Sequence, residues 1–232
     1  MLVRFHPRPD QNPPLTRIER TQFKPTLAAI HQSHLHPELQ TETQVQAQAQ
    51  QILDLVKPTS ALDWLGLVLL LDQLPRNCYR GAEAALVYTF FDPIARAIAF
   101  KALEQGILTT SPDIRYRLAL RHWFYLPFMH SEDLAHQELV LGQYREMSED
   151  LWNLLDHKSA GKLGQKELAC REVLASNRDA VEAVMKQNFK FQKEHHDIIA
   201  RFGRYPYRNQ VLGRSTTEEE EKFLTQTNIS FG

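Results

Sequence analysis

The stretch ALDWLGLVLLLDQL, residues 61–74, is the best apolar segment of the 232-residue chain. Its apolar residues lie on nearly every side of a helix, which is the pattern of a helix buried all round. Thr59 or Ser60 can cap its first turn, and we expect Pro75 to end it, because proline lacks the N–H group that a continuing helix needs. Aspartates interrupt the run, which is too short to span a bilayer. The sequence therefore predicts a central core helix in a soluble protein.

The remaining chain predicts further helices separated by Pro, Gly and Ser. Residues 1–14 contain four prolines and are expected to form an extended arm. Helices are predicted over residues 16–34, 38–56, 81–105, 111–123, 132–156, 166–201 and 217–224. No segment shows the alternation of a strand bounded by turns. We expect an all-α fold, a single domain of about seven to nine helices in antiparallel pairs, with residues 1–58 as an N-terminal arm and accessory helices and residues 59–232 as the main helical domain.

Individual residues predict where several of these helices begin and end. Asp92, followed by proline, is expected to interrupt the helix at 81–105 and cap a new segment. Pro127 is expected to end one helix and Ser131 to cap the next. Gly203 is placed to end the long helix at 166–201. The residues TTEE, 216–219, with the glutamate that follows them, form a capping box for the last helix.

Composition restricts the class of partner and the cellular compartment. Charged residues make up 24% of the chain and the formal net charge is -1, which gives no electrostatic footprint for nucleic acid or an anionic membrane. The two cysteines, Cys78 and Cys170, have neither metal-site nor disulfide-framework spacing, so we predict a reducing, cytoplasmic location. The N-terminus lacks the apolar core of a secretory signal. Nucleotide, dinucleotide, zinc-protease and calcium motifs are absent, and no cofactor or metal is expected.

Polar residues gather at three proline-marked segments, here called the first, second and third corners. They are LLLDQLPRNCYRG (69–81), WFYLPFMHSED (123–133) and FGRYPYRNQVLGR (202–214). Each follows an apolar helix, breaks at a proline behind Leu or Tyr, and then carries charged or amide side chains. Because proline restricts the backbone, such corners hold polar side chains with little entropy left to lose. We expect the three corners to face one another across a polar pocket.

The corners contain groups suited to an anion and to proton transfer. Arg76 in the first corner and Arg208 in the third are each followed by asparagine, and arginine binds carboxylate or phosphate with two parallel hydrogen bonds. The alternative is that both arginines pair with acidic residues and tie helix ends together, since buried charges must be paired. His130 and His195 are candidates for a general acid or base, although each could equally be a packed or surface histidine.

The three corners and their order resemble the DUF924 family, an all-helical family of unknown function whose fold is similar to that of tetratricopeptide-repeat (TPR) proteins. The resemblance covers about residues 62–224. It implies that the polar residues of the corners belong to the family's motifs. One position departs from the pattern, because Tyr207 stands where the family usually has histidine.

Two functions are compatible with these residues. The first is a small-molecule enzyme of the isomerase, lyase or hydrolase type, without a redox cofactor, that acts on an anionic or carbonyl-bearing substrate. The second is a non-catalytic helical module that binds a peptide or partner protein and uses the corners as a structural ion-pair network. For the enzyme, the candidate catalytic residues are His130, His195, Asp72 and Glu132. The candidate substrate-binding residues are Arg76, Asn77, Arg80, Arg204, Tyr207, Arg208 and Asn209.

Overall fold

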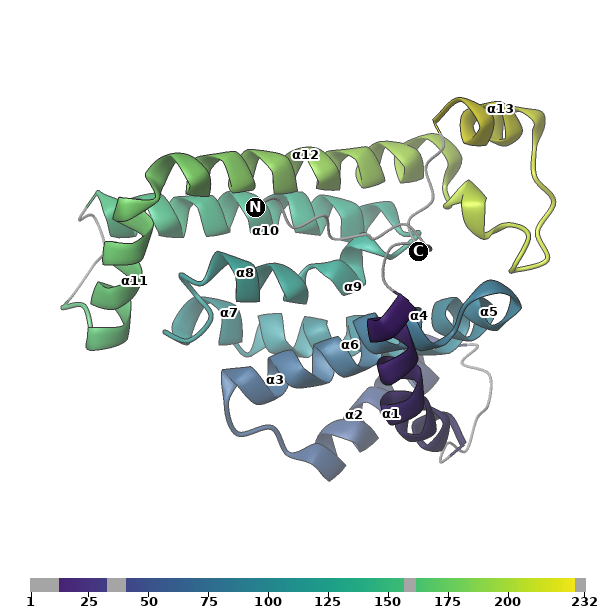
Figure 1. Ribbon diagram of the computed structural model, residues 1–232, viewed down its shortest axis with the longest axis horizontal. Helices are drawn as coiled ribbons and strands as arrows, with labels where there is room; N and C mark the ends of the chain where they lie inside the picture. The colour runs from purple at the N-terminus through teal and green to yellow at the C-terminus, as the bar shows by residue number, and fades with distance from the viewer. Residues whose placement is uncertain (1–12, 33–40, 157–161, 228–232) are drawn as a thin grey trace.

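The computed structural model describes residues 13–32, 41–156 and 162–227 (Figure 1). These residues form α-helices joined by short 3₁₀-helical and π-helical turns, and no strand occurs among them. The all-α prediction is confirmed. Most of the predicted extended arm, residues 1–12, lies outside the described residues, and the helix predicted from residue 16 begins at Pro13.

The helical segments fall into two groups along the chain. The first group is α1 (Pro13–Gln32), α2 (Glu42–Val56), α3 (Ala61–Val68), α4 (Leu74–Cys78), α5 (Ala84–Leu86) and α6 (Asp92–Glu104). The second group is α7 (Ile107–Thr110), α8 (Leu118–Arg121), α9 (Leu126–Met129), α10 (Leu134–Leu155), α11 (Gln165–Ser176), α12 (Arg178–Phe202) and α13 (Glu218–Thr227). Two π-helical turns, Leu69–Gln73 and Val87–Phe91, join α3 to α4 and α5 to α6.

The central helix begins as predicted but does not end at its proline. Ser60 caps α3, because its hydroxyl accepts a hydrogen bond from the Asp63 N–H at 3.2 Å and the Asp63 carboxylate accepts one from the Ser60 N–H at 2.9 Å. The π-helical turn Leu69–Gln73 then leads directly into α4. Pro75 lies in the first turn of α4, where no N–H donor is required, so the prediction that it ends the helix was wrong.

Two further helix boundaries differ from their predictions. Asp92 was predicted to be a cap, but the helical path continues into α6 without a side-chain cap, while the proline that follows Asp92 lies in the first turn of the new segment, where a proline is expected. Pro127 was predicted to end a helix and instead lies in the first turn of α9. The predicted helix at 111–123 is reduced to turns followed by α8 and a 3₁₀ turn.

The N-terminus of α10 differs from its prediction by two residues. Asp133 is the cap, because its carboxylate accepts a hydrogen bond from the Ala135 N–H at 2.9 Å. The Ser131 hydroxyl instead accepts from the Asp133 N–H, at 3.2 Å. Ser131 therefore shapes the turn before the helix, and the prediction that it caps the helix was wrong.

The second half of the chain is built on a long helix pair. Figure 1 shows α10 and α12 running antiparallel, with α11 across one end and α13 beyond the other. Gly203 ends α12 in the left-handed conformation, with φ +67°, as predicted. The capping box of α13 is also confirmed, because the Glu220 N–H donates to the Thr217 hydroxyl at 3.2 Å and the Thr217 N–H donates to the Glu220 carboxylate at 2.8 Å.

The apolar core holds the corners in place. One large cluster of buried apolar side chains includes residues from α2, α3, α6, α9 and α10, such as Phe128, and from the two π-helical turns, such as Leu71 and Phe91. A separate small cluster of Ile198, Ile199 and Tyr205 lies under the third corner. In the N-terminal part of the chain, α1 packs on α4 and α2 packs on α6. No helix in the described part of the chain is long and apolar enough to cross a membrane.

Two glycines with open space at the Cβ position test the local geometry. We expect Gly203→Ala to lower the free energy of unfolding by about 1–2 kcal/mol, because alanine must adopt the left-handed conformation. The matched variant Gly66→Ala lies in α3, and there the expected effect is a gain of about 0.5–1 kcal/mol, since alanine loses less conformational entropy in a helix. Urea unfolding of both variants measures these changes. Equal effects at the two positions would contradict this assignment.

Candidate functional site

A buried ion pair joins the first corner to α6. The π-helical turn brings Asp72 to the interior and α4 carries Arg76 one turn later. The Arg76 Nη2 donates to the Asp92 Oδ1 at 2.6 Å and lies 3.6 Å from the Asp72 Oδ1. Both aspartates are buried. Arg76 therefore neutralises two carboxylates that could not remain charged in the interior without it.

Asp72 also joins the first corner to the second. The His130 Nδ1 lies 2.8 Å from the Asp72 Oδ1, and because an ionised carboxylate only accepts, this nitrogen carries the hydrogen. Burial by itself would raise the pKa of Asp72, but the charge of His130 when protonated, that of Arg76, and hydrogen bonds lower it to about 2. Burial and then the charge of Arg76 lower the pKa of His130. At neutral pH we expect ionised Asp72 beside neutral His130.

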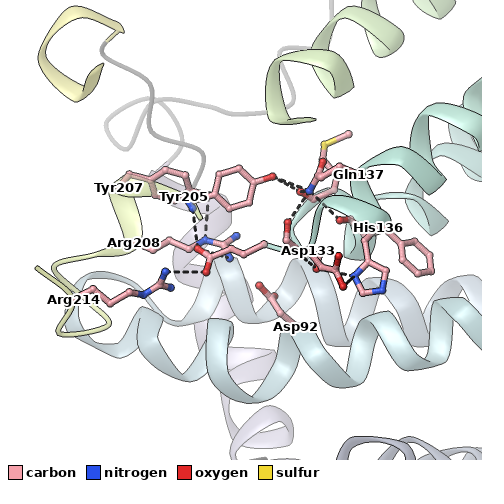
Figure 2. Close-up of polar contacts among 12 residues, drawn as sticks. Asp92, Asp133, His136, Gln137, Tyr205, Tyr207, Arg208 and Arg214 are labelled. Carbon is pink, nitrogen blue, oxygen red and sulfur yellow. Dashed lines mark hydrogen bonds and ion pairs between the residues drawn. The ribbon is translucent and has the colours of Figure 1, made fainter. Parts of the chain in front are cut away.

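Glu132 joins the second corner to the third (Figure 2). Its carboxylate accepts a hydrogen bond from the Tyr205 N–H at 3.0 Å and pairs with the Arg214 Nη1 at 2.9 Å. The Arg208 Nη1 lies 3.9 Å away. Glu132 thus holds the loop that follows α12 against the start of α10.

Arg208 lies among aromatic rings. Its side chain is 4% exposed, and its guanidinium carbon is 4.4 Å from the ring centre of Tyr88, 4.6 Å from that of Tyr205 and 5.6 Å from that of Tyr207. Stacked guanidinium groups gain cation–π stabilisation when they are removed from water. The three tyrosines therefore hold Arg208 in place beside the first corner.

A buried amide network supports the second and third corners. The Gln137 Nε2 donates to the backbone carbonyls of Met129 at 2.9 Å and Ser131 at 2.7 Å, and the Tyr205 hydroxyl donates to the same Met129 carbonyl. The Gln192 Nε2 donates in turn to the Gln137 Oε1 at 2.8 Å. These contacts satisfy carbonyls that the end of α9 leaves without a partner inside the helix.

Two predicted substrate-binding residues take part in contacts with α13. The Arg204 Nε donates to the Glu220 Oε1 at 2.6 Å, and the Asn209 Nδ2 donates to the Glu220 Oε2 at 3.2 Å. The hydrogen bond from Arg204 lowers the pKa of Glu220 to about 2, together with further hydrogen bonds and against the effect of burial. Arg204 and Asn209 thus attach the third corner to the last helix.

His195 packs under the third corner and does not line the cavity described next. Its Nδ1 donates to the Phe191 carbonyl at 2.8 Å, and its ring packs edge-on against the rings of Phe191 and Tyr205. Asn77 contributes its backbone carbonyl, which accepts a hydrogen bond from the Arg20 Nε at 3.5 Å. Neither side chain reaches the cavity described next.

A cavity of about 210 Å³ lies where the first and third corners meet, and we call it the corner cavity. Its lining consists of two arginines, three tyrosines and small or apolar residues: Arg76, Tyr79, Arg80, Gly81, Ala84, Val87, Tyr88, Tyr207 and Val211. The second corner does not line it, although Asp72 contacts Arg76 and His130 contacts Asp72 in turn. The first and third corners thus line the corner cavity, and the second corner only supports it.

Some buried polar atoms around this cavity have no hydrogen-bond partner in the described part of the chain. They are the Arg76 Nε, the Asp92 Oδ2 and the Arg208 Nη2. Unpaired buried donors cost free energy and mark places where an absent ligand or water fits. Within the described residues, no group of three or more His, Cys, Asp and Glu side chains is arranged to hold a metal ion.

Several residues of the site were missed in the sequence. Asp92 was predicted to be a helix cap, although its carboxylate accepts a hydrogen bond from Arg76, which lies sixteen residues earlier in the chain. Tyr88, Tyr205 and Gln137 carry no local motif, because their roles depend on contacts between distant helices. Only the aromatic content of the third corner gave a signal for Tyr205.

The Asp72–His130 pair predicts a dependence of stability on pH. The folded-state pKa of each group lies below its ordinary value, so the unfolded chain binds more protons and stability falls on acidification. For His130 the loss begins as the pH falls below about 6.5, and for Asp72 it follows between about 4 and about 2. We expect His130→Asn, which retains a donor near the Nδ1 position, to lose less stability than the wild type between about pH 7.5 and pH 5.

Urea unfolding of both proteins across this pH range measures the difference. Because the two proteins share every other histidine, the difference isolates His130. Identical pH profiles would show that folding does not lower the pKa of His130.

Comparisons with known proteins agree with the resemblance of the corners. A solved structure described as a protein of unknown function, ATU0120 from Agrobacterium tumefaciens, is similar at 27% sequence identity, with a TM-score of 0.56, over 91% of this chain and 85% of that one. No curated protein matches. The model of the family described as bacterial protein of unknown function (DUF924) matches residues 16–228, which include all three corners. The chain therefore belongs to the DUF924 family.

Proposed function

We propose that this protein binds a small anionic or carbonyl-bearing molecule in the corner cavity and acts on it by non-redox acid–base chemistry. The observation that carries the proposal is the position of two arginines on one small cavity, one of which, Arg76, has a buried Nε–H without a hydrogen-bond partner in the described chain. Isomerase, lyase and hydrolase reactions all require such stabilisation of a negatively charged oxygen.

The lining favours a carboxylate with an apolar or aromatic body. Arg76 and Arg80 supply charge, and the Arg80 side chain makes no hydrogen bond or ion pair with the described residues, so its donors can turn to a ligand. Tyr79, Tyr88 and Tyr207 supply ring surface. A planar carboxylate on an aromatic or branched body satisfies both kinds of surface.

Tyr207 is the proton donor in this proposal, and the Asp72–His130 pair positions Arg76. Burial raises the pKa of Tyr207, so its hydroxyl stays protonated and can donate to an oxygen that gains charge. Neutral His130 and ionised Asp72 lie on the far side of Arg76, where they hold the guanidinium in position. In this arrangement His195, Arg204 and Asn209 support the fold. A cytoplasmic location also belongs to the proposal, because the two cysteines form no disulfide.

Calorimetric titration with benzoate, acetate and inorganic phosphate tests the binding site. We expect benzoate to bind most tightly and Arg80→Met to weaken its Kd at least about tenfold, because a charge-assisted hydrogen bond contributes about 1.5–3 kcal/mol. The matched variant Arg117→Met removes an exposed arginine far along the chain and is expected to leave the Kd unchanged. Arg76 is unsuitable for this test, because its removal leaves buried Asp92 and Asp72 uncompensated at a cost of about 3–5 kcal/mol.

Absence of binding by all three anions, or equal binding to wild type and Arg80→Met, would contradict the proposed site. Where a ligand is turned over, Tyr207→Phe is expected to lower kcat by about 10²-fold or more at nearly constant Kd. A variant with unchanged kcat would assign the proton donor to another group.

A second function is favoured by a separate groove. A cavity of about 580 Å³ lies between α10 and α12, with Tyr144, Met185 and Phe189 among its apolar lining residues. Basic residues outnumber acidic ones around it: Arg145, Lys186, Lys190 and Lys193 against Glu194 and Asp197. This combination suits an acidic amphipathic helix of a partner protein, which would place apolar side chains on Phe189 and carboxylates on the lysines.

A fluorescent amphipathic peptide with glutamates on one face tests this second function. If it holds, the peptide binds at low salt, weakens as salt increases, and is lost in Phe189→Ala but not in the matched variant Phe23→Ala on α1. Binding that both variants retain would show that the groove is not the docking site.

A further inference from the structure

A second polar cavity lies at the junction of α2, α6 and the start of α10, and we call it the junction cavity. Its volume is about 350 Å³, larger than the corner cavity. The side chains that matter for its chemistry are Glu42, Gln46, Arg96, Phe100, Asp133 and His136. None of these residues lines the corner cavity, although Asp133 ends the second corner and Figure 2 shows Asp133 and His136 close to the Gln137 network.

Arg96 is a half-buried charge without a partner in the described part of the chain, where it makes no hydrogen bond or ion pair. Other buried arginines differ, since Arg76 pairs with Asp92 at 2.6 Å and Arg121 pairs with Asp150 at 2.6 Å. Burial lowers the pKa of Arg96, and the more distant carboxylates of Asp92, Glu42 and Asp133 only partly oppose it. The guanidinium donors of Arg96 are therefore available to a carboxylate that enters the cavity.

Two carboxylates line the same cavity and retain free acceptor capacity. The Glu42 Oε1 accepts one hydrogen bond, from the Gln46 Nε2 at 2.8 Å. The Asp133 Oδ1 accepts from a backbone N–H as the cap of α10, while its Oδ2 is 3.8 Å from the His136 Nδ1. Burial and then the charge of Arg96 lower the pKa of His136, so at neutral pH we treat it as neutral. The cavity thus offers one cationic group and two anionic groups.

This charge distribution selects one class of ligand. Phosphate or another dianion gains the attraction of Arg96 but meets the repulsion of Glu42 and Asp133. A simple cation meets the opposite conflict with Arg96. A ligand with both charges satisfies all three groups. We propose that the junction cavity binds a small zwitterion of the α-amino acid class, with its carboxylate on Arg96, its ammonium between Glu42 and Asp133, and its side chain over Phe100.

The test is calorimetric titration of the full chain with L-leucine, L-alanine and L-glutamate. Two analogues of leucine isolate its charges, because 4-methylpentanoate lacks the ammonium group and 3-methylbutylamine lacks the carboxylate. We expect at least one amino acid to bind, and each charge-deleted analogue of leucine to bind at least about tenfold more weakly than leucine if leucine is the ligand found. For another amino acid, the corresponding carboxylate and amine serve as the analogues.

Variants locate the binding. Arg96→Met and Glu42→Gln are each expected to weaken the Kd at least about tenfold. Because Glu42 is exposed, its variant can be measured even where the Arg96 variant fails to fold. Arg117→Met, an exposed arginine that lines neither cavity, is the matched control and is expected to leave the Kd unchanged. No binding of any amino acid, equal binding of the analogue without ammonium, or loss of binding in Arg117→Met alone would overturn the proposal.

Discussion

The salt bridge between Arg76 and Asp92 is the interaction on which the rest of the polar interior depends. It joins the first corner to α6 at 2.6 Å in a buried environment, where neither charge is stable alone. Through Asp72 the same guanidinium is connected to His130 and the second corner. The pair therefore combines two functions that are usually distinct, since it ties helices together and places a charged group on a cavity.

The chain gains this arrangement at the expense of regular helices. A π-helical turn precedes each partner of the pair, Leu69–Gln73 before Arg76 and Val87–Phe91 before Asp92. Such turns add a residue to the helical path and are frequent at functional sites. Prolines in the following first turns then fix the direction of the chain without losing a needed hydrogen bond. Irregular backbone thus coincides with the polar residues, while the apolar core remains helical.

Local signals could be read from the sequence, and contacts between distant helices could not. The Ser60 cap, Gly203 and the capping box of α13 were predicted correctly, because each depends on residues within one helical turn. Pro75 and Pro127 were misread as helix ends, because a proline is equally compatible with the first turn of a new helix, where no N–H donor is required. Arg76, Arg80 and Tyr207 were correctly expected near one another, whereas the partnership of Arg76 with Asp92 depends on the packing of α4 near α6 and has no local signature.

We propose above all that the corner cavity holds an anion beside Arg76 and Arg80, and that these residues do not serve only as a structural ion-pair network. A crystal structure of the protein grown with 4-bromobenzoate tests it most directly, because the anomalous signal of bromine locates the ligand without reference to the protein. The account predicts bromine density between the rings of Tyr88 and Tyr207, with the carboxylate within hydrogen-bond distance of Arg76 or Arg80. An empty corner cavity at saturating ligand, with bromine elsewhere or absent, would contradict it.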